Sequence, residues 1–296
     1  MPIPLRWKGT FRAGGKGPSF ALKQAKGSAS SYSYYVKGEE EKIIRDLKIG
    51  EELNHAIDRG EFVLHFQPYY SSKDLRLAGA EALIRWHSHA LGGLLYPKDF
   101  LHIVERKKLT KKLDYWVFEE AVRLIKSHSI NVPISLNLSP LSIDEGLPDY
   151  LRTLIEKYEV NPSLINLEIT EEAVIRDTER TSKILEEVHK LGIGIVLDDF
   201  GILYSSLSLL SKLPISCLKI DKSFVDRLED VKTLNIVQHL ISMCRALNIK
   251  TVAEGVEQEW QVNLLIRMGC DYMQGYYLKK PIPLDKLLDL IKEQDS

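Results

Sequence analysis

The most informative stretch of this chain is residues 193–201, with the sequence IGIVLDDFG, in which an apolar run ends at two aspartates. Such a run is typical of a buried strand, so we expect the charged groups at its end to lie on the rim of a sheet. The same arrangement recurs along the chain, where polar groups stand near the ends of other apolar runs, at Glu81, Asn137, Glu168, Lys219 and Glu254, with Glu171 one turn after Glu168.

With Asp198 and Asp199, these positions include six carboxylates. Carboxylates gathered on one rim repel each other strongly, and such a cluster is usually neutralised by a cation. Hard oxygen ligands favour magnesium, manganese or calcium over a thiol-seeking metal. The pattern therefore predicts a divalent metal site at one end of a sheet.

The distances between these groups along the chain predict a barrel of strands and helices. Neighbouring groups are roughly 20 to 55 residues apart, which matches one or two strand–helix units of a barrel that takes about 250 residues for eight units. The candidate strands are residues 62–69, 77–86, 134–138, 165–169, 193–198, 217–220, 250–253 and 272–277.

Helix-like stretches separate the later strands. Residues 176–190, which Gly192 follows, and residues 231–247 have the length and periodicity of crossover helices. Alternating units of this kind predict a mostly parallel sheet. Residues 70–76 are too short for a crossover helix, so the first two strands should form an antiparallel hairpin. The predicted fold class is α/β, a TIM-like (β/α)8 barrel with the first strand antiparallel to the rest.

Eight short motifs resemble those of the EAL-domain phosphodiesterases, which hydrolyse the bacterial second messenger cyclic di-GMP. They occur in the family's order and at its spacing, and the resemblance covers about residues 50–290. The motifs are EALIRW at 81–86, FQP at 66–68, NLS at 137–139, EITE at 168–171, DDFG at 198–201, KID at 219–221, EGVE at 254–257 and QGY at 274–276.

The resemblance implies hydrolysis of one phosphodiester bond of cyclic di-GMP to linear pGpG, with two Mg²⁺ or Mn²⁺ ions. The implied ligands of the first ion are Glu81, Asn137, Glu168 and Asp198, and those of the second are Asp198, Asp199 and Glu254. The implied catalytic residues are Lys219, which would position the attacking water, and Glu254. The implied substrate contacts are Gln67, Leu83, Arg85 and Gln274, with Arg85 holding a phosphate oxygen.

Glu171 has a different implied role. It anchors the loop after the paired aspartates, which in the family links the metal site to the interface of a homodimer. This chain departs from the family there, because Ile202 and Leu203 stand where relatives usually carry a small residue and then glycine. Glycine permits backbone angles that leucine resists, so the loop is expected to be stiffer or to differ in conformation.

Three classes of function remain open on the sequence. The first is an active phosphodiesterase. The second is a catalytically weak module that binds cyclic di-GMP and acts through a protein partner, which the Ile202-Leu203 difference favours. The third is a scaffold that neither binds nor cleaves, for which the sequence offers no support.

Composition sets wider limits. The chain has 296 residues, of which 44% are apolar, and a net charge of −1, which argues against binding a nucleic acid duplex. No stretch reaches the roughly 20 apolar residues needed for membrane insertion. Three cysteines without metal-ligand spacing predict a reducing cytoplasm.

The N-terminal residues 1–38 contain Lys and Arg but no acid, and they are rich in Gly and Ser. We expect a disordered basic segment there, as a flexible linker or a remnant of an upstream domain, with a faint likeness to a transit peptide. The barrel domain is expected at residues 39–296.

Overall fold

The computed structural model describes residues 39–175, 177–201, 210 and 212–295. The chain divides into two compact units, residues 1–49 and residues 50–296. In the first unit the described part is the beginning of helix α2 (Glu39–Ala56). The disordered segment expected at residues 1–38 lies outside the described residues, so that expectation stays a prediction. The strands of the described residues all belong to the second unit.

Eight strands of the second unit close into a barrel. Strand β1 is antiparallel to both of its barrel neighbours, β2 and β9, and every other neighbouring pair in the barrel is parallel. The predicted fold class is thus confirmed. The barrel strands are β1 (Phe62–Ser71), β2 (Leu77–Ser88), β4 (Ile134–Asn137), β5 (Ile165–Thr170), β6 (Gly194–Phe200), β7 (Cys217–Ile220), β8 (Lys250–Ala253) and β9 (Tyr272–Gln274).

All eight predicted strands are present, with small shifts at their ends. The largest shift is in β9, which ends at Gln274, whereas the predicted strand extended to residue 277. Two short strands, β3 (Gly93–Leu95) and β10 (Ile282–Pro283), pair with β2 and β1 outside the closed barrel.

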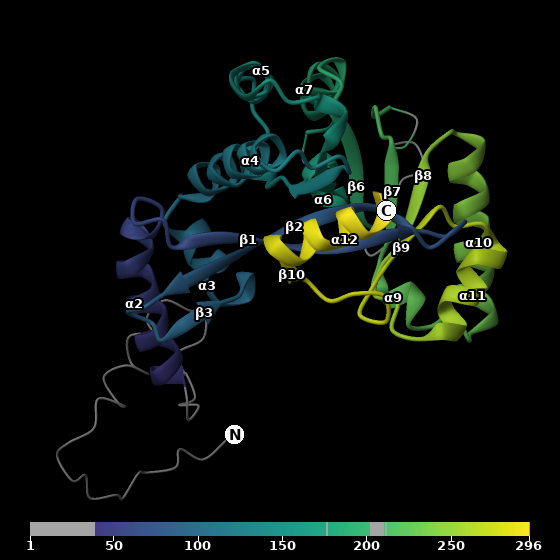
Figure 1. Ribbon diagram of the computed structural model, residues 1–296, viewed down its shortest axis with the longest axis horizontal. Coiled ribbons are helices and arrows are strands. Elements are labelled where there is room, and N and C mark those ends of the chain that lie inside the picture. The colour runs from purple at the N-terminus through teal and green to yellow at the C-terminus, as the bar shows by residue number, and fades with distance from the viewer. Residues whose placement is uncertain (1–38, 176, 202–209, 211, 296) are drawn as a thin grey trace, which may run out of the picture. The chain divides into compact units, whose positions relative to one another are not determined.

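Helices cover the outside of the barrel (Figure 1), with α10 and α11 beside β8 and β9 and with α12 across β1 and β2. The predicted crossover helices are confirmed as α7 and α10, each beginning after an aspartate whose side chain accepts a backbone N–H. The helices are α3 (Pro97–Arg106), α4 (Thr110–Ser127), α5 (Leu147–Tyr158), α6 (Glu171–Ile175), α7 (Thr178–Lys190), α9 (Lys222–Val225), α10 (Val231–Ala246), α11 (Glu259–Met268) and α12 (Leu284–Asp295), with single 3₁₀ turns η1 (Pro140–Ser142) and η2 (Pro162–Leu164).

The apolar core lies between the barrel and its helices. Alternate strand residues are apolar and almost completely buried, as for Ile165 and Leu167 on β5, and they belong to one cluster with helix residues such as Leu185 on α7. The intervening residues, Asn166 and Glu168, point to the opposite side of the strand, into the barrel. The barrel interior is therefore polar on this strand, and the apolar layer outside it supplies the burial that stabilises the fold.

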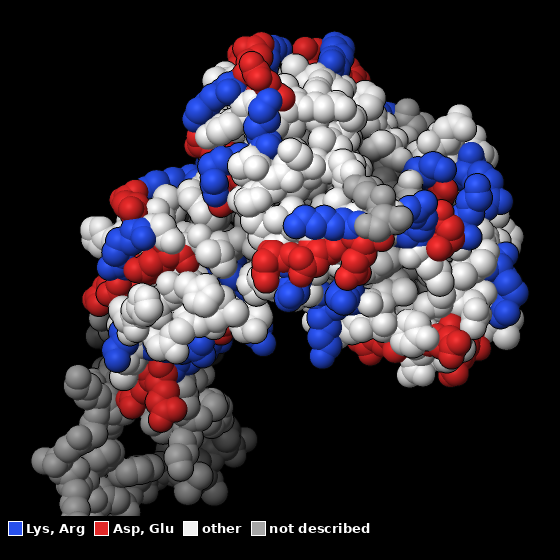
Figure 2. Space-filling model, viewed as in Figure 1, with Lys and Arg blue, Asp and Glu red and all other residues white. Residues whose placement is uncertain are grey.

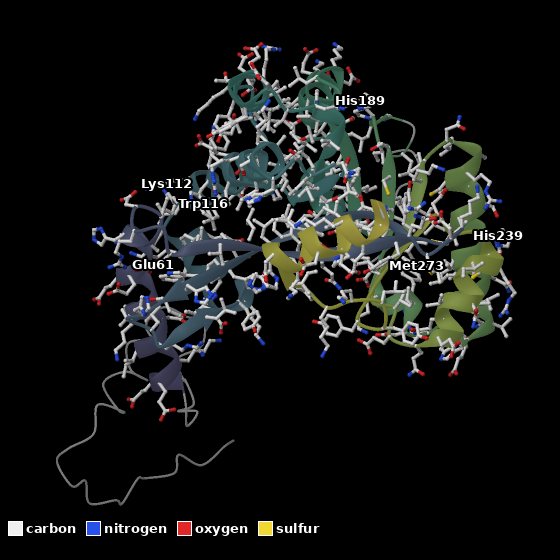
Figure 3. All side chains as sticks on the ribbon, in the orientation of Figure 1. Glu61, Lys112, Trp116, His189, His239 and Met273 are labelled. Carbon is white, nitrogen blue, oxygen red and sulfur yellow. The ribbon has the colours of Figure 1, made fainter. Side chains whose placement is uncertain are left out.

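An aromatic cluster packs at the beginning of β1. The ring of Phe62 lies 5.5 Å from that of Trp86, 5.8 Å from that of Phe100 and 5.6 Å from that of Trp116. The indole Nε1 of Trp86 donates a 2.8 Å hydrogen bond to the carboxylate of Glu61. Figure 3 labels Trp116 and Glu61 beside this part of the barrel. The cluster joins α3 and α4 to the hairpin of β1 and β2.

The surface carries mixed charge on the barrel face that Figure 2 shows. Lys and Arg side chains there are interspersed with Asp and Glu side chains and do not gather into one basic surface. Such mixing supplies no focused attraction for a polyanion. Among the described residues, none of the helices has both the length and the apolar character required to cross a membrane.

The location of the core can be tested by truncating a buried isoleucine. Ile165 is 1% exposed, and Ile165→Ala should lower the free energy of unfolding by about 2–5 kcal/mol, because it leaves a cavity in a packed layer. The matched control is Ile236→Ala on α10, whose side chain is 53% exposed and whose effect should stay below about 0.5 kcal/mol. Urea denaturation measures both, and equal losses would contradict this location of the core.

Candidate active site

The polar groups predicted at strand ends lie at one end of the barrel. Parallel strands present their C-terminal ends on the same face, which is where barrel enzymes carry their active sites. Lys219 lies on β7, and Glu254 directly follows β8. The other predicted metal ligands are Glu81 on β2, Asn137 at the end of β4, Glu168 on β5, and Asp198 and Asp199 on β6.

The ammonium group of Lys219 is the centre of this cluster. Its Nζ lies 2.7 Å from the carboxylate of Glu254 and 2.8 Å from that of Glu168. It also lies 3.4 Å from the carboxylate of Asp198 and 3.5 Å from that of Glu81. The lysine side chain is only 3% exposed. Four strands thus place carboxylates around one buried cation.

Glu81 is fixed by further hydrogen bonds. The side-chain amide of Asn137 donates to its Oε1 at 2.9 Å, and that of Gln274 donates to its Oε2 at 3.0 Å. Burial acts to raise the pKa of Glu81, but the Lys219 ammonium and the two amide donors outweigh it and hold the pKa below its ordinary value. Glu81 is therefore held as a carboxylate.

The remaining carboxylates are not fully neutralised by one lysine. Burial raises the pKa of Glu168 to about 8 and that of Glu254 to about 7, although the Lys219 ammonium acts to lower both. Neighbouring carboxylates contribute to both rises. A cluster of oxygen donors with more negative charge than one ammonium can balance is chemically suited to divalent cations. The donor set therefore fits the metal ions expected from the sequence.

The side chains do not form a ready-made metal cage. Within the described ranges, no three His, Cys, Asp or Glu side chains are arranged to hold a metal ion as they stand. Lys219 lies between the carboxylates instead. Metal binding would therefore require the lysine and its partners to shift.

A bulge in β6 presents the two aspartates. The register between β6 and β7 shifts between Leu197 and Phe200, and Asp199 has a φ of 56°, in the left-handed region. Consecutive residues of a regular strand point to opposite faces, and a bulge breaks that alternation. The backbone N–H of Asp199 donates to the carboxylate of Asp198 at 2.8 Å. Burial and the charges of Asp198 and Asp221 raise the pKa of Asp199.

A pocket opens beside Glu254. Two of the predicted substrate contacts, Gln67 and Gln274, line it, and Gln67 is paired with Glu81 across β1 and β2. Its wall also includes groups to which the sequence analysis gave no role, namely Lys222, Gly255, Glu257, Gly275 and Tyr276. Lys222 holds Glu257 at 2.7 Å, a contact between α9 and the loop after β8 that no local sequence pattern indicates.

The other two predicted substrate contacts, Leu83 and Arg85, are not among the groups that line this pocket. Both lie further along β2 than Glu81, with Leu83 half-buried and Arg85 buried. The Arg85 guanidinium lies 5.1 Å from the centre of the Tyr96 ring, and one of its nitrogens donates to the Ile84 carbonyl oxygen. Its Nε is buried and makes no hydrogen bond within the described residues.

Glu171 begins α6 and is 1% exposed. It directly follows β5, so it lies next to the rim in sequence and is buried as an anchoring group would be. Ile202 and Leu203, which belong to the loop that it is expected to anchor, lie outside the described residues. The role of Glu171 stays a prediction.

Comparison with known proteins gives consistent likenesses. The model of the EAL domain matches residues 50–281. The bifunctional diguanylate cyclase/cyclic di-GMP phosphodiesterase MucR of Pseudomonas aeruginosa is 36% identical over 266 residues, which cover 88% of this chain and 38% of that protein. The probable cyclic di-GMP phosphodiesterase PdeB of Escherichia coli is 38% identical over 241 residues, which cover 80% of this chain and 46% of that protein. The chain therefore spans less than half the length of either relative.

Solved structures show the same likeness. The phosphodiesterase PaMucR, in complex with c-di-GMP, superimposes with a TM-score of 0.76 at 38% identity, covering 81% of this chain and 99% of that one. The FimX EAL domain of Pseudomonas aeruginosa, also bound to c-di-GMP, gives a TM-score of 0.74 at 25% identity, covering 79% of this chain and 96% of that one.

The central lysine can be tested through stability. In buffer with a chelator, Lys219→Met should lower the free energy of unfolding by about 3–5 kcal/mol, because it leaves buried carboxylates without their cation. Mn²⁺ should restore part of that loss. The control is Lys250→Met, which removes a pair with Asp271 at 2.8 Å whose lysine is 59% exposed, and it should change stability by at most about 1 kcal/mol. If Lys219→Met lowers the free energy of unfolding no more than the control does, Lys219 is not the charge that stabilises the cluster.

Proposed function

This chain belongs to the EAL-domain family, and from that premise we propose that it hydrolyses one phosphodiester bond of cyclic di-GMP to give linear pGpG. The observation that carries the proposal is the ring of Glu81, Glu168, Asp198 and Glu254 around Lys219 at the C-terminal end of the barrel. Relatives that bear the name of cyclic di-GMP phosphodiesterase support the substrate.

The same ring is the proposed metal centre. We assign Glu81, Asn137, Glu168 and Asp198 to a first Mg²⁺ or Mn²⁺ ion, and Asp198, Asp199 and Glu254 to a second. Two such ions would supply Lewis acidity that activates water and neutralises charge on the phosphoryl oxygens. The oxygen-only donors and the unbalanced negative charge at Glu168 and Glu254 favour hard divalent cations.

Lys219 is the proposed residue that orients the attacking water. Its ammonium has three N–H donors and no acceptor, so it can hold a water oxygen by donating but cannot remove a proton while it is charged. Glu168 and Glu254 fix its position from two strands, at 2.8 and 2.7 Å. Glu254 is the proposed acceptor for the proton that the water loses.

The substrate is proposed to lie across the pocket beside Glu254. Gln67 and Gln274 would contact it there. Gln67 is paired with Glu81 across β1 and β2, and the side chain of Gln274 donates a hydrogen bond to Glu81. Arg85 would hold a phosphate oxygen through its charged guanidinium. Its buried Nε–H makes no hydrogen bond within the described residues, so it is available to donate one. Leu83, between Glu81 and Arg85 on β2, would give an apolar contact to the dinucleotide.

The alternative is a module that binds cyclic di-GMP with little or no turnover and acts through a protein partner. The substitution of Ile202 and Leu203 for the family's smaller residues favours it. Chromatography of the products distinguishes the two functions, because the enzyme releases pGpG and the module leaves the substrate intact while still binding it. The homodimer, the anchoring role of Glu171 and the cytoplasmic location stay predictions.

Loss of a ligand shared by both proposed ions should abolish most of the activity. Asp198→Ala should reduce turnover at least about a hundredfold, since metal ions contribute several kcal/mol to the stabilisation of the transition state. The control is Asp289→Ala on α12, whose carboxylate is 54% exposed and pairs with Lys286 at 3.1 Å. Its turnover should equal that of the wild type. Product formation from cyclic di-GMP with Mg²⁺ or Mn²⁺ is measured, and near-native turnover by Asp198→Ala would end the two-metal assignment.

Lys219 should affect catalysis more than binding. At saturating metal, Lys219→Met should lower kcat by roughly two to four orders of magnitude and change KM only a few-fold, as expected of a group that orients the nucleophile. Steady-state kinetics on the folded variant measure the two constants separately. An increase in KM as large as the decrease in kcat would instead make Lys219 a phosphate-binding residue.

A further inference from the structure

The carboxylate of Asp114, on α4, is bonded to the turn that follows β4. Its Oδ2 accepts a hydrogen bond from the backbone N–H of Ser139 at 3.1 Å and another from the hydroxyl of Ser142 at 2.6 Å. Ser142 is completely buried. One carboxylate oxygen therefore fixes both ends of the η1 segment to a helix on the outside of the barrel.

The residue that depends on this turn is Asn137. It is the last residue of β4 and its side chain is exposed at the rim, where it donates to Glu81. The strand ladder continues for one more residue, because the N–H of Leu138 donates to the carbonyl oxygen of Glu168 at 2.8 Å. The next fixed point along the chain is Ser139, and Asp114 supplies it. Asn137 is thus held between a strand on one side and Asp114 on the other.

The contact is not simply part of the turn's own capping. The hydroxyl oxygen of Ser139 already accepts the N–H of Leu141, and the N–H of Ser142 already donates to the Ser139 carbonyl oxygen. The turn therefore has its local hydrogen bonds without Asp114. Burial raises the pKa of Asp114 to about 6 even though both serine donors act to lower it. A buried carboxylate is a costly way to stabilise a turn, which favours a positional role over a stabilising one.

We propose that Asp114 is a positioning residue for Asn137, and that its two bonds to the turn after β4 set the affinity of the rim for a divalent cation. The inference rests on the proposed metal centre, in which Asn137 is a ligand. Groups that hold a metal ligand in orientation typically change metal affinity when they are removed, although they do not touch the metal.

The experiment measures Mn²⁺ binding to the full chain by titration calorimetry, without substrate. Asp114→Ala should raise the Kd for Mn²⁺ roughly 10–100-fold. Asp114→Asn retains an acceptor oxygen at the same distance from the backbone, so its Kd for Mn²⁺ should stay within about threefold of that of the wild type. Ser142→Ala removes one of the two bonds and should raise the Kd by less than Asp114→Ala. If Asp114→Ala does not fold, Ser142→Ala becomes the test. A raised Kd in Ser142→Ala supports the positioning role, and an unchanged Kd overturns it.

The matched control is Asp271→Ala, at the beginning of β9. Asp271 makes the same pair of contacts through one oxygen, accepting the backbone N–H of Thr251 at 3.0 Å and its hydroxyl at 3.2 Å. It lies at the opposite end of the strands from the rim, so Asp271→Ala should leave the Kd unchanged. Wild-type affinity in folded Asp114→Ala, or an equal weakening in Asp271→Ala, would overturn the positioning role alone. Absence of Mn²⁺ binding by the wild type would overturn the proposed metal centre itself.

Discussion

The buried ammonium of Lys219 is the interaction on which the arrangement of this barrel depends. Four strands direct carboxylates at it, and each of those carboxylates would carry a large desolvation penalty without a counter-charge. Lys219 offsets part of that penalty, and the negative charge that it leaves unbalanced is what suits the site to divalent cations. The apolar layer lies on the other face of the strands, between strands and helices, where Ile165 and Leu167 are almost completely buried. On β5 the two-residue alternation of the strand therefore separates the chemistry of the rim from the apolar core.

Local patterns in the sequence predicted part of this arrangement. In a strand whose outer face is buried, apolar residues alternate with other residues, and here a charged residue stands near the strand's end. This local pattern was sufficient to predict that Glu168 and Lys219 lie on the rim of the sheet. The resemblance of the short motifs then identified the set. The antiparallel first pair also followed, because a connector of a few residues cannot contain a helix.

Other features of the site depend on contacts that no local pattern encodes. The bulge at Asp198 and Asp199 is a departure from strand alternation, and no local sequence pattern distinguishes the bulged strand from a regular one. The ion pair of Lys222 with Glu257 joins residues 35 positions apart, and the hydrogen bond from the backbone N–H of Ser139 to Asp114 joins residues 25 positions apart. Tertiary packing decides these contacts, and their energies are small beside the burial that forms the core.

The rim groups are consequently held by two different means. Glu81, Glu168 and Lys219 lie within strands, where ladder hydrogen bonds on both sides fix the backbone. Groups at or beyond strand ends need separate supports. Asp199 depends on the bulge, Asn137 on the turn after β4, and Glu254 on its N–H bond to the Ile220 carbonyl oxygen at 3.0 Å and on the following Gly255, whose φ is +67°. The backbone of the in-strand groups is fixed by the barrel, so a shift there is limited to the side chains, whereas the strand-end groups depend on contacts outside the ladder.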